Sequence, residues 1–268
     1  MKRLTLLTAV TAIVLAFSSC KKNDFPHPYC KLIAIDRGTG NKHAYTYNAQ
    51  GKITKMDRDF IAGPGPALKF EFLFTYSAGG LLIKADAKLD GANYGTSNFI
   101  YAGGRLSKVN YTRADGTTGV NNFKYNGAGL IIESTDESGT PADSKQYFEY
   151  NNQGIMTKRG AADLAGNKFF EILTTPVGVA KSPEQLLLAH GLPYDVLTGM
   201  PWQIAEGKTG TAFETYAPGP PAGNLVLVGT GTITNAVVNS KGYIIESTGN
   251  DGSEESSVTS RYTLMGCN

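Results

Sequence analysis

Residues that could carry out catalysis are few in this chain of 268 residues. The three histidines are His27, His43 and His190, and none belongs to a His-Glu-x-x-His motif. The chain also has no Gly-x-Ser-x-Gly nucleophile elbow and no complete Gly-x-x-x-x-Gly-Lys-Ser/Thr phosphate-binding loop. A hydrolytic triad would need His43 or His190 together with a nucleophile that no motif identifies. We therefore expect a protein that is not an enzyme.

Two glutamates occupy the same position in two nearly identical stretches, GLIIESTDESG (129–139) and GYIIESTGNDG (242–252). Paired carboxylates are the catalytic groups of most glycosidases, so Glu133 and Glu246 are candidates for glycoside cleavage. The equivalent position in other copies of the stretch is lysine, at Lys55, Lys84, Lys108 and Lys158. A position that accepts either charge is better explained as an outward scaffold position whose long stem covers a neighbouring ring.

The sequence offers no recognisable metal site. The acidic turns DESGTPAD (136–143) and GNDGSEES (249–256) could bind calcium, but neither has the ligand spacing of an EF-hand. Cys30 and Cys267 lack the clustered histidines of a zinc site. We expect no metal and no cofactor.

One group of residues could bind a ligand. The stretch PYDVLTGMPWQ (193–203) holds the only tryptophan, Trp202, together with Tyr194 and Asp195. Aromatic faces beside hydrogen-bonding groups suit a sugar ring, so these three are the candidate ligand-binding residues. The alternative is that Trp202 packs a helix onto a sheet.

The N-terminus has the pattern of a lipoprotein signal. Lys2 and Arg3 precede an apolar stretch, 4–17, that is too short to span a bilayer comfortably, and two serines lead into Cys20. We expect residues 1–19 to be removed, Cys20 to carry lipid that anchors the protein to a membrane, and residues 20–29 to form a flexible tether. The alternative is an ordinary signal peptide with a chance cysteine. Residues 30–268 would form a single domain.

Charge and cysteine content narrow the class of protein further. Removal of residues 1–19 leaves 25 − 2 = 23 basic residues against 23 acidic ones. A neutral chain has no broad positive field, so we expect no nucleic-acid binding. Cys30 and Cys267 stand at opposite ends of the body, and an oxidising compartment favours a disulfide that joins the first and last strands. Two buried free thiols are the alternative.

Most of the body consists of a repeated aromatic-x-aromatic unit. The units are YTYNAQGKITKM (45–56), FTYSAGGLLIKA (74–85), FIYAGGRLSKV (99–109), FKYNGAGLIIES (123–134), FEYNNQGIMTKR (148–159) and AVVNSKGYIIES (236–247). Each predicts a β-hairpin whose loop glycine supplies a positive φ. The expected register places the second aromatic opposite an apolar residue, as Tyr47 with Ile53. It places the first aromatic opposite a charged one, as Tyr45 with Lys55.

The third unit is one residue shorter than the others and tests this interpretation. Gly103-Gly104 can form a two-residue loop closed by Ala102 and Arg105. Tyr101 then still faces Leu106, and Phe99 is expected to face Lys108. A change of turn type therefore preserves the faces of the strand, which favours consecutive hairpins.

The Tyr-x-x-x-Gly-x-Leu unit resembles the YD repeat of RHS-type shell proteins, in which successive hairpins extend one curling sheet. It departs from that repeat because the Asp after Tyr is replaced by Asn48, Ser77, Ala102, Asn126 and Asn151. The lipoprotein signal and body together are more similar to lipoproteins of Bacteroidetes-type bacteria that have a porin-like β fold and no assigned function. This resemblance implies an outer-membrane lipoprotein, and it carries over no catalytic residue.

Residues 160–235 interrupt the repeat, so specialised function is expected there. Ser182, Pro183 and Gln185 predict the start of a short helix over about 183–190, and Gly191 predicts its end. Two helical turns are not stable alone, so this insertion must be buried in or over one end of the sheet.

The sequence therefore predicts an all-β protein: an antiparallel meander of β-hairpin repeats curling into a barrel-like or half-barrel sheet, with one short helix in an insertion. Lysine and glutamate beside the aromatics argue against a membrane-spanning barrel. We expect a non-catalytic binding or adhesion module of the outer membrane, surface-exposed or periplasm-facing, for a glycan, peptide or envelope protein. The alternatives are a structural envelope component that pairs through its sheet edges and, less favoured, a hydrolase.

Overall fold

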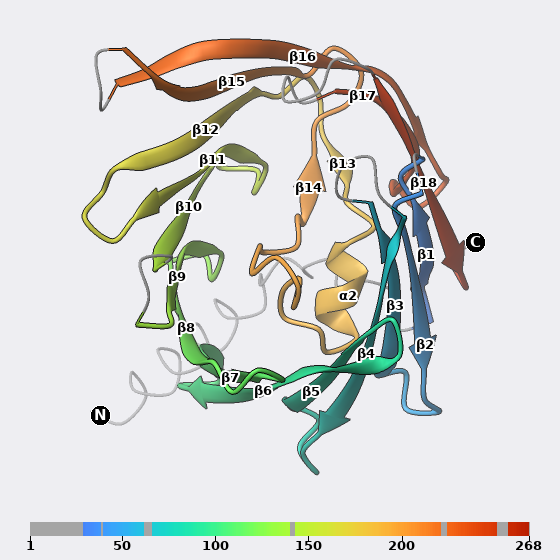
Figure 1. Ribbon diagram of the computed structural model, residues 1–268. Helices are drawn as coiled ribbons and strands as arrows, with labels where there is room; N and C mark the ends of the chain where they lie inside the picture. The colour runs from blue at the N-terminus through green and yellow to red at the C-terminus, as the bar shows by residue number, and fades with distance from the viewer. Residues whose placement is uncertain are drawn as a thin grey trace, which may run out of the picture.

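The protein folds as a closed antiparallel β-barrel (Figure 1). The computed structural model describes residues 29–38, 40–61, 66–139, 143–220, 224–250 and 257–267. Sixteen strands form the barrel, each paired with the next along the chain, and β18 pairs with β1 to close it. The predicted all-β meander is confirmed, and the sheet closes fully. The barrel strands are β1 (Lys31–Asp36), β2 (Lys42–Tyr47), β3 (Ile53–Phe60), β4 (Leu68–Tyr76), β5 (Leu82–Leu89), β6 (Ala92–Ala102), β7 (Arg105–Arg113), β8 (Thr118–Tyr125), β9 (Ile131–Glu137), β10 (Ser144–Tyr150), β11 (Met156–Asp163), β12 (Lys168–Thr175), β15 (Ala212–Gly219), β16 (Asn224–Val238), β17 (Ile244–Gly249) and β18 (Val258–Met265).

Several sequence-based expectations fall on residues outside the described part of the chain. These are the signal sequence 1–19, the lipidated Cys20 and all but the last residue of the tether. Parts of both acidic turns, residues 140–142 and 251–256, also lie outside it, so the structure does not test calcium binding there.

The repeat units form the hairpin loops at one end of the barrel. In the first loop, Asn48 donates its N–H to the carbonyl of Lys52 at 2.9 Å, and Gly51 has φ 76°. The Asn48 side-chain oxygen accepts the Lys52 N–H, also at 2.9 Å. The same side-chain bond is made by Ser77, Asn126, Asn151 and Asn239. The position after the second aromatic therefore needs a short side chain with an acceptor oxygen.

The third unit explains the one exception, Ala102. Ala102 pairs directly with Arg105, and Gly103 and Gly104 both have positive φ, 58° and 78°. In the longer loops the side chain at this position accepts a backbone N–H, as Asn48 does from Lys52. The two-residue loop is closed by direct pairing of Ala102 with Arg105, so alanine is sufficient there. The predicted change of turn type is confirmed.

In four of the six units the tyrosine ties its hairpin to the strand that precedes the hairpin. The Tyr47 hydroxyl donates to the carbonyl of Leu32 at 2.6 Å, and the Tyr76 hydroxyl donates to the carbonyl of Ile53 at 2.7 Å. The same bond joins Tyr125 to Leu106 and Tyr150 to Ile131. These bonds link neighbouring strands near the repeat loops, so the tyrosines brace that rim of the barrel from β1 to β10 at four places.

The predicted pairing of the first aromatic was wrong. Tyr47 faces Ile53 as expected, but Thr46 faces Lys55 and Tyr45 faces Met56. A β-bulge at Thr54 inserts one extra residue into the return strand, and every repeat hairpin has the same shift. Phe99 likewise faces Val109, and Lys108 faces Ile100. The bulge turns two residues of each return strand, three positions apart, towards the interior, and in β3, β5 and β7 both of them are apolar and buried.

Lysines and glutamates of the repeat form ion pairs on the outside of the barrel. Glu71 joins Lys55 at 2.8 Å and Lys88 at 2.9 Å. Glu133 pairs with Lys124 at 2.6 Å, and Glu246 pairs with Arg261 at 2.9 Å. Exposed pairs of this kind contribute little stability each, but they account for both candidate glutamates as scaffold residues.

The two ends of the chain meet in the barrel wall. Cys30, just before β1, forms a disulfide with Cys267, just after β18, and their Cα atoms are 4.5 Å apart. The bond therefore crosses the seam at which the first and last strands pair.

The predicted insertion 160–235 was too wide. Strands β11, β12, β15 and β16 continue the barrel through much of that range, because they form hairpins without the tyrosine motif. Only residues 176–211 leave the wall, and we call this segment the plug. It contains β13 (Ala180–Lys181), α2 (Gln185–Ala189) and β14 (Ala205–Glu206), and Figure 1 shows these elements inside the ring of strands. Among the described residues, no helix has the length and apolar character needed to cross a bilayer.

Substitution of Tyr76 by Phe tests the tyrosine braces. We expect Tyr76→Phe to lower the free energy of unfolding by about 1 kcal/mol, because it leaves the Ile53 carbonyl without its donor. Tyr216→Phe is the matched control, since that hydroxyl bonds only to the exposed Glu214 in the described structure. Equal unfolding curves for both variants in denaturant would contradict a bracing role.

Candidate functional site

The plug is held in place by its own turn chemistry and by contacts with the wall. The Ser182 hydroxyl accepts the N–H of Glu184 at 3.3 Å, so it caps the turn that leads into α2. The helix is shorter than predicted, because 183 and 184 form a turn before it. Gly191 has φ 97° and ends the helix as predicted, and Leu192 donates its N–H to the carbonyl of Leu187.

One side of the plug fills part of the barrel with apolar side chains. Leu186, Leu187 and Leu192 are completely buried. They belong to one continuous core with the inward residues of β1 to β11, which include Ile53, Met56, Phe72, Phe74, Leu82, Phe99 and Leu106. This half of the barrel is a packed interior.

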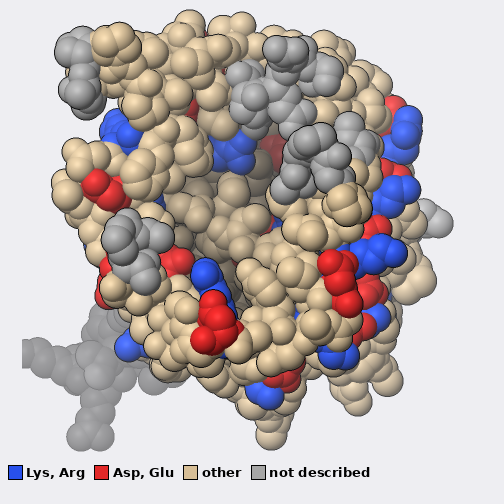
Figure 2. Space-filling view, in the orientation of Figure 1, with Lys and Arg blue, Asp and Glu red and all other residues tan. Residues whose placement is uncertain are grey.

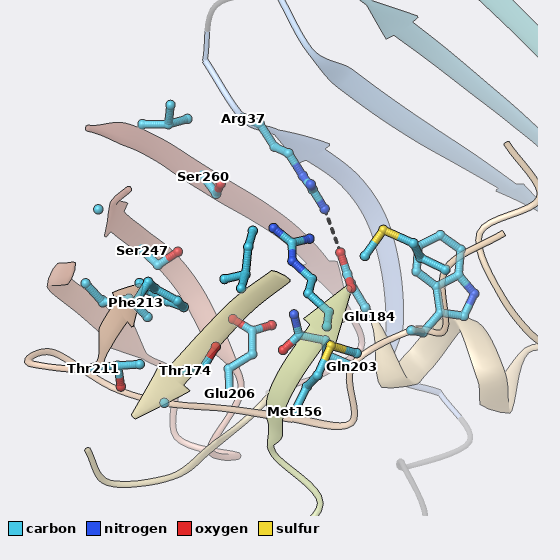
Figure 3. A pocket seen from close by; sticks show the side chains of 18 of the residues that line it. Arg37, Met156, Thr174, Glu184, Gln203, Glu206, Thr211, Phe213, Ser247 and Ser260 are labelled. Carbon is cyan, nitrogen blue, oxygen red and sulfur yellow. Dashed lines mark hydrogen bonds and ion pairs between the residues drawn. The ribbon is translucent and has the colours of Figure 1, made fainter. Parts of the chain in front are cut away.

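The other side of the plug leaves a cavity of about 430 Å³. Its walls are the plug and strands β3, β11, β12 and β15 to β18, together with Asn41 and Asn250. Figure 2 shows a hollow in this face of the molecule, with both basic and acidic atoms in it. Side chains of Thr174, Phe213, Ser247 and Ser260 line the cavity together with polar groups of the plug (Figure 3).

Two arginines of the barrel anchor acidic residues of the plug at this cavity. Arg58 of β3 binds Asp195 at 2.8 Å, and both side chains are about nine-tenths buried. Burial raises the pKa of Asp195, but the charge of Arg58 outweighs that effect and the net pKa is lowered. Arg37, just after β1, binds Glu184 at 2.7 Å (Figure 3). Burial nevertheless keeps the pKa of Glu184 above its usual value.

Glu206 is the third acidic residue of the cavity. Pairing of β14 with β13 places it beside Ala180, and its side chain faces the cavity (Figure 3). Burial, with a further contribution from the charge of Glu184, raises the pKa of Glu206 from 4.5 to about 7. A hydrogen bond from Ser182 and the charge of Arg37 oppose this shift without cancelling it. Glu206 can therefore hold a proton near neutral pH.

The two histidines in the described part of the chain, His43 and His190, have structural partners. His190 contacts the carbonyl of Gly51 through Nδ1 at 2.6 Å and the carbonyl of Cys30 through Nε2 at 2.8 Å. It therefore fastens the plug to the first repeat loop and to the disulfide. His43 is buried, and burial together with Arg58 and Arg37 lowers its pKa to about 3. Its described partner is the Tyr45 hydroxyl, at 3.3 Å.

The three candidate ligand-binding residues do not form one patch. Trp202 and Asp195 line the cavity, but Asp195 is already bound to Arg58. Tyr194 is buried against the wall, with ring centres 4.9 Å from Phe123 and 6.1 Å from Phe99. Trp202 is 5% exposed and belongs to the apolar core as well as to the cavity. Packing and cavity lining are thus combined in one side chain.

Sequence reasoning missed the charged residues of the cavity. Arg37, Arg58, Arg159, Glu184 and Glu206 line it, and they come from five separate segments. Arg58 and Arg159 could have been found from the strand pattern once the bulge is included, because both then occupy inward positions of their strands. Without the bulge, strict alternation from Ile53 and Met156 would place both arginines on the outer face. No sequence pattern brings Glu184 and Glu206 together.

Comparison with known proteins supports the fold. The chain matches no protein-family model, and no curated protein matches it. It is similar to the crystal structure of a porin-like protein from Bacteroides uniformis, with TM-score 0.54 and 14% identity over 89% of this chain and 98% of that one. This likeness shows a porin-like β-barrel fold. The Photorhabdus luminescens Tc holotoxin pore matches with TM-score 0.26 and 12% identity over 79% of this chain and 12% of that one, which is too low to compare the folds.

Glu206→Gln tests the raised pKa of this group. The folded carboxyl keeps its proton up to about pH 7, whereas an unfolded Glu loses it near 4.5, so the folded state binds more protons between these values. Stability should therefore fall as pH rises through this window, and less so in Glu206→Gln. Unfolding measured between about pH 5 and about pH 8 checks this, with Glu137→Gln on the exposed surface as control. Parallel pH profiles for wild type and Glu206→Gln would be inconsistent with a shifted group.

Proposed function

We propose that this protein is a non-catalytic lipoprotein of the cell envelope that binds a glycan or peptide ligand inside its barrel. The cavity beside Trp202 carries this proposal. A purely structural barrel is stabilised by filling its interior. This barrel packs one half and leaves about 430 Å³ open in the other. A cavity of this size, lined by aromatic, hydroxyl and charged groups, is typical of small-ligand sites.

The outer surface favours a barrel surrounded by water over one that spans a bilayer. Ion pairs such as Lys55–Glu71 and Lys84–Asp86 stand on its outer face, where a membrane barrel carries an apolar band. The interior is correspondingly apolar around the plug. Attachment to a membrane then rests on lipid at Cys20, and the tyrosine hairpins act as YD-like scaffold.

The fold also suggests how the cavity would be presented. Tyr29 precedes β1 at the end of the barrel where β1 begins, and that end carries the repeat loops. The cavity-lining residues Asn41 and Asn250 lie at the opposite end of the strands. A protein tethered through Cys20 would therefore hold that end of the cavity away from the anchoring membrane.

The alternatives have weaker support. A structural component that pairs through its sheet edges would need a free edge strand. The barrel closes through β1 and β18, so the sheet offers little free edge. The exposed Leu227 and Val228 of the β15–β16 hairpin are the strongest argument for it. A hydrolase would need an ionised carboxylate and a protonated one, and Glu184 and Glu206 share the cavity. Glu184 is occupied by Arg37, which favours a structural role for that carboxylate.

Cys20→Ser tests the membrane anchor. We expect the wild-type protein to fractionate with membranes and to incorporate labelled fatty acid, because multiple acyl chains hold a protein stably on a bilayer. Cys20→Ser should lose both properties and be released in folded form. Persistent membrane association of the variant would rule out lipid as the anchor.

Ser260→Phe tests the cavity as the binding site. Ser260 lines the cavity, so an added phenyl ring should occupy the ligand volume and abolish glycan-array or peptide-array signal. Thr75→Phe adds the same ring at an exposed position of β4 and should keep the signal. Binding that survives in a folded Ser260→Phe protein would place the site elsewhere. Release of reducing sugar from any bound glycan would favour the hydrolase.

A further inference from the structure

The end of the barrel that carries the repeat loops is basic. Five cations lie there, and we call them the basic rim: Lys31, Lys52, Arg105, Lys181 and Lys241. Lys181 belongs to the plug, but it donates its backbone N–H to the carbonyl of Gly242 in the β16–β17 loop at 2.9 Å. The repeat loops 48–52, 77–81, 103–104, 126–130, 151–155 and 239–243 contain no aspartate and no glutamate. Among the described residues, none of the five cations has a partner in an ion pair.

Tyrosine rings hold four of these cations at the rim. Lys31 Nζ lies 5.0 Å from the centre of the Tyr47 ring. The same arrangement joins Lys52 to Tyr76 at 5.9 Å, Arg105 to Tyr125 at 5.6 Å and Lys181 to Tyr243 at 5.6 Å. The hydroxyls of three of these tyrosines are bonded to carbonyls of the wall, so their rings are fixed: Tyr47, Tyr76 and Tyr125. A fixed ring face attracts a cation without neutralising its charge, so the positive charges stay at this end of the barrel.

The two ends of the barrel differ in charge. Exposed acidic side chains at the opposite end include Asp90, Asp115 and Glu137. The glutamates of the repeat strands that lie nearest to the repeat loops are neutralised in ion pairs, namely Glu133 with Lys124, Glu149 with Lys158 and Glu246 with Arg261. The whole chain has 25 basic and 23 acidic residues, so it carries little net charge. The positive field is therefore confined to one end, where a negatively charged surface can approach it.

Exposed apolar side chains accompany the basic rim. Tyr29 is 71% exposed and Met265 is 52% exposed, and both lie beside the disulfide at the chain ends. Leu81, in the β4–β5 loop, is 43% exposed. Basic and apolar side chains together are typical of protein surfaces that lie in the headgroup layer of a bilayer.

The chain towards Cys20 leaves the barrel at this same end. Tyr29 precedes β1, and the nine residues 20–28 join it to Cys20. Nine residues span at most about 32 Å when fully extended. Two of them, Lys21 and Lys22, are also basic. Lipid on Cys20, as proposed above, would therefore keep the basic rim close to the membrane.

We propose that the basic rim docks the barrel on the anionic surface of a bilayer. The five cations bind lipid phosphate groups, and the exposed apolar side chains enter the headgroup layer. This goes beyond the proposed function, which assigns membrane contact to the lipid on Cys20, and it requires no ligand in the cavity. The barrel is then held end-on, with its repeat loops on the membrane.

Vesicle binding tests the basic rim separately from the lipid anchor. Every protein is the full chain with Cys20→Ser, so no acyl chain on that residue contributes. Each is mixed with vesicles of phosphatidylcholine alone or with about one-third phosphatidylglycerol, and bound protein is measured by sedimentation. We expect at least about tenfold tighter binding to the anionic vesicles, and release as salt rises from about 0.05 M to about 0.5 M, because salt screens exposed charges.

Matched charge reversals locate the contact. Arg105→Glu combined with Lys241→Glu should weaken binding to anionic vesicles by at least about tenfold, since each cation near such a surface contributes roughly a fivefold factor. Lys69→Glu combined with Arg113→Glu is the control and should bind as the parent protein does. It changes the charge by the same amount, also at an exposed lysine and an exposed arginine, but at the opposite end of the barrel. Unfolding curves confirm that both double variants are folded.

The outcomes separate this proposal from the lipid anchor. Equal binding of the two double variants would overturn docking through the basic rim. Binding to soluble heparin without binding to anionic vesicles would assign the rim to a soluble polyanion and overturn the membrane contact. In fractionation of cells, a wash at about 0.5 M salt releases protein held by the rim but not protein held by acyl chains, so the test of Cys20 stays independent.

Discussion

A closed barrel of sixteen strands is too wide for its own side chains to fill, and the rest of the structure follows from that constraint. Eight strands give an interior that side chains can occupy, and twice that number leaves an open lumen. A lumen that is not packed contributes no hydrophobic core. The plug supplies the missing apolar surface through Leu186, Leu187 and Leu192. It is a single segment of 176–211, so it covers one side of the lumen and leaves the other side open.

Anchoring the plug requires polar contacts, because a segment without regular sheet pairing leaves backbone groups and charges inside. Arg58–Asp195 and Arg37–Glu184 bridge the wall and the plug on the cavity side, and His190 bridges them at the repeat loops. Buried ion pairs of this kind contribute little net stability compared with apolar packing, but removal of one partner leaves a costly charge. They therefore fix the position of the plug more than they stabilise the fold. The same residues give the cavity its charge.

The scaffold could be predicted from the sequence because its information is local and repeated. Asn48 and Gly51 encode a loop by themselves, and the shorter unit at Gly103–Gly104 confirms the hairpin by preserving the Tyr101–Leu106 pair. The bulge was not predicted, because Thr54 differs little from an ordinary strand residue and the bulge is set by twist and by the fit of Ile53 and Met56 to the core. That single shift hid Arg58 and Arg159. The cavity itself depends on how far the plug fills the lumen, which no local pattern encodes.

The division between repeat and plug also explains why a ligand site would lie where it does. In the first four repeat hairpins the inward positions are used mainly for packing and many outward ones for ion pairs, so a change at one unit disturbs its neighbour where a tyrosine brace joins them. The hairpins β11–β12 and β15–β16 lack the motif, and their inward residues Ile172, Thr174 and Phe213 meet the cavity. These positions face open volume and not a packed core, so substitutions there change the shape and polarity of the site at little cost in stability. A fixed scaffold with one adjustable wall is a physical arrangement in which related chains can keep the barrel and differ in what they bind.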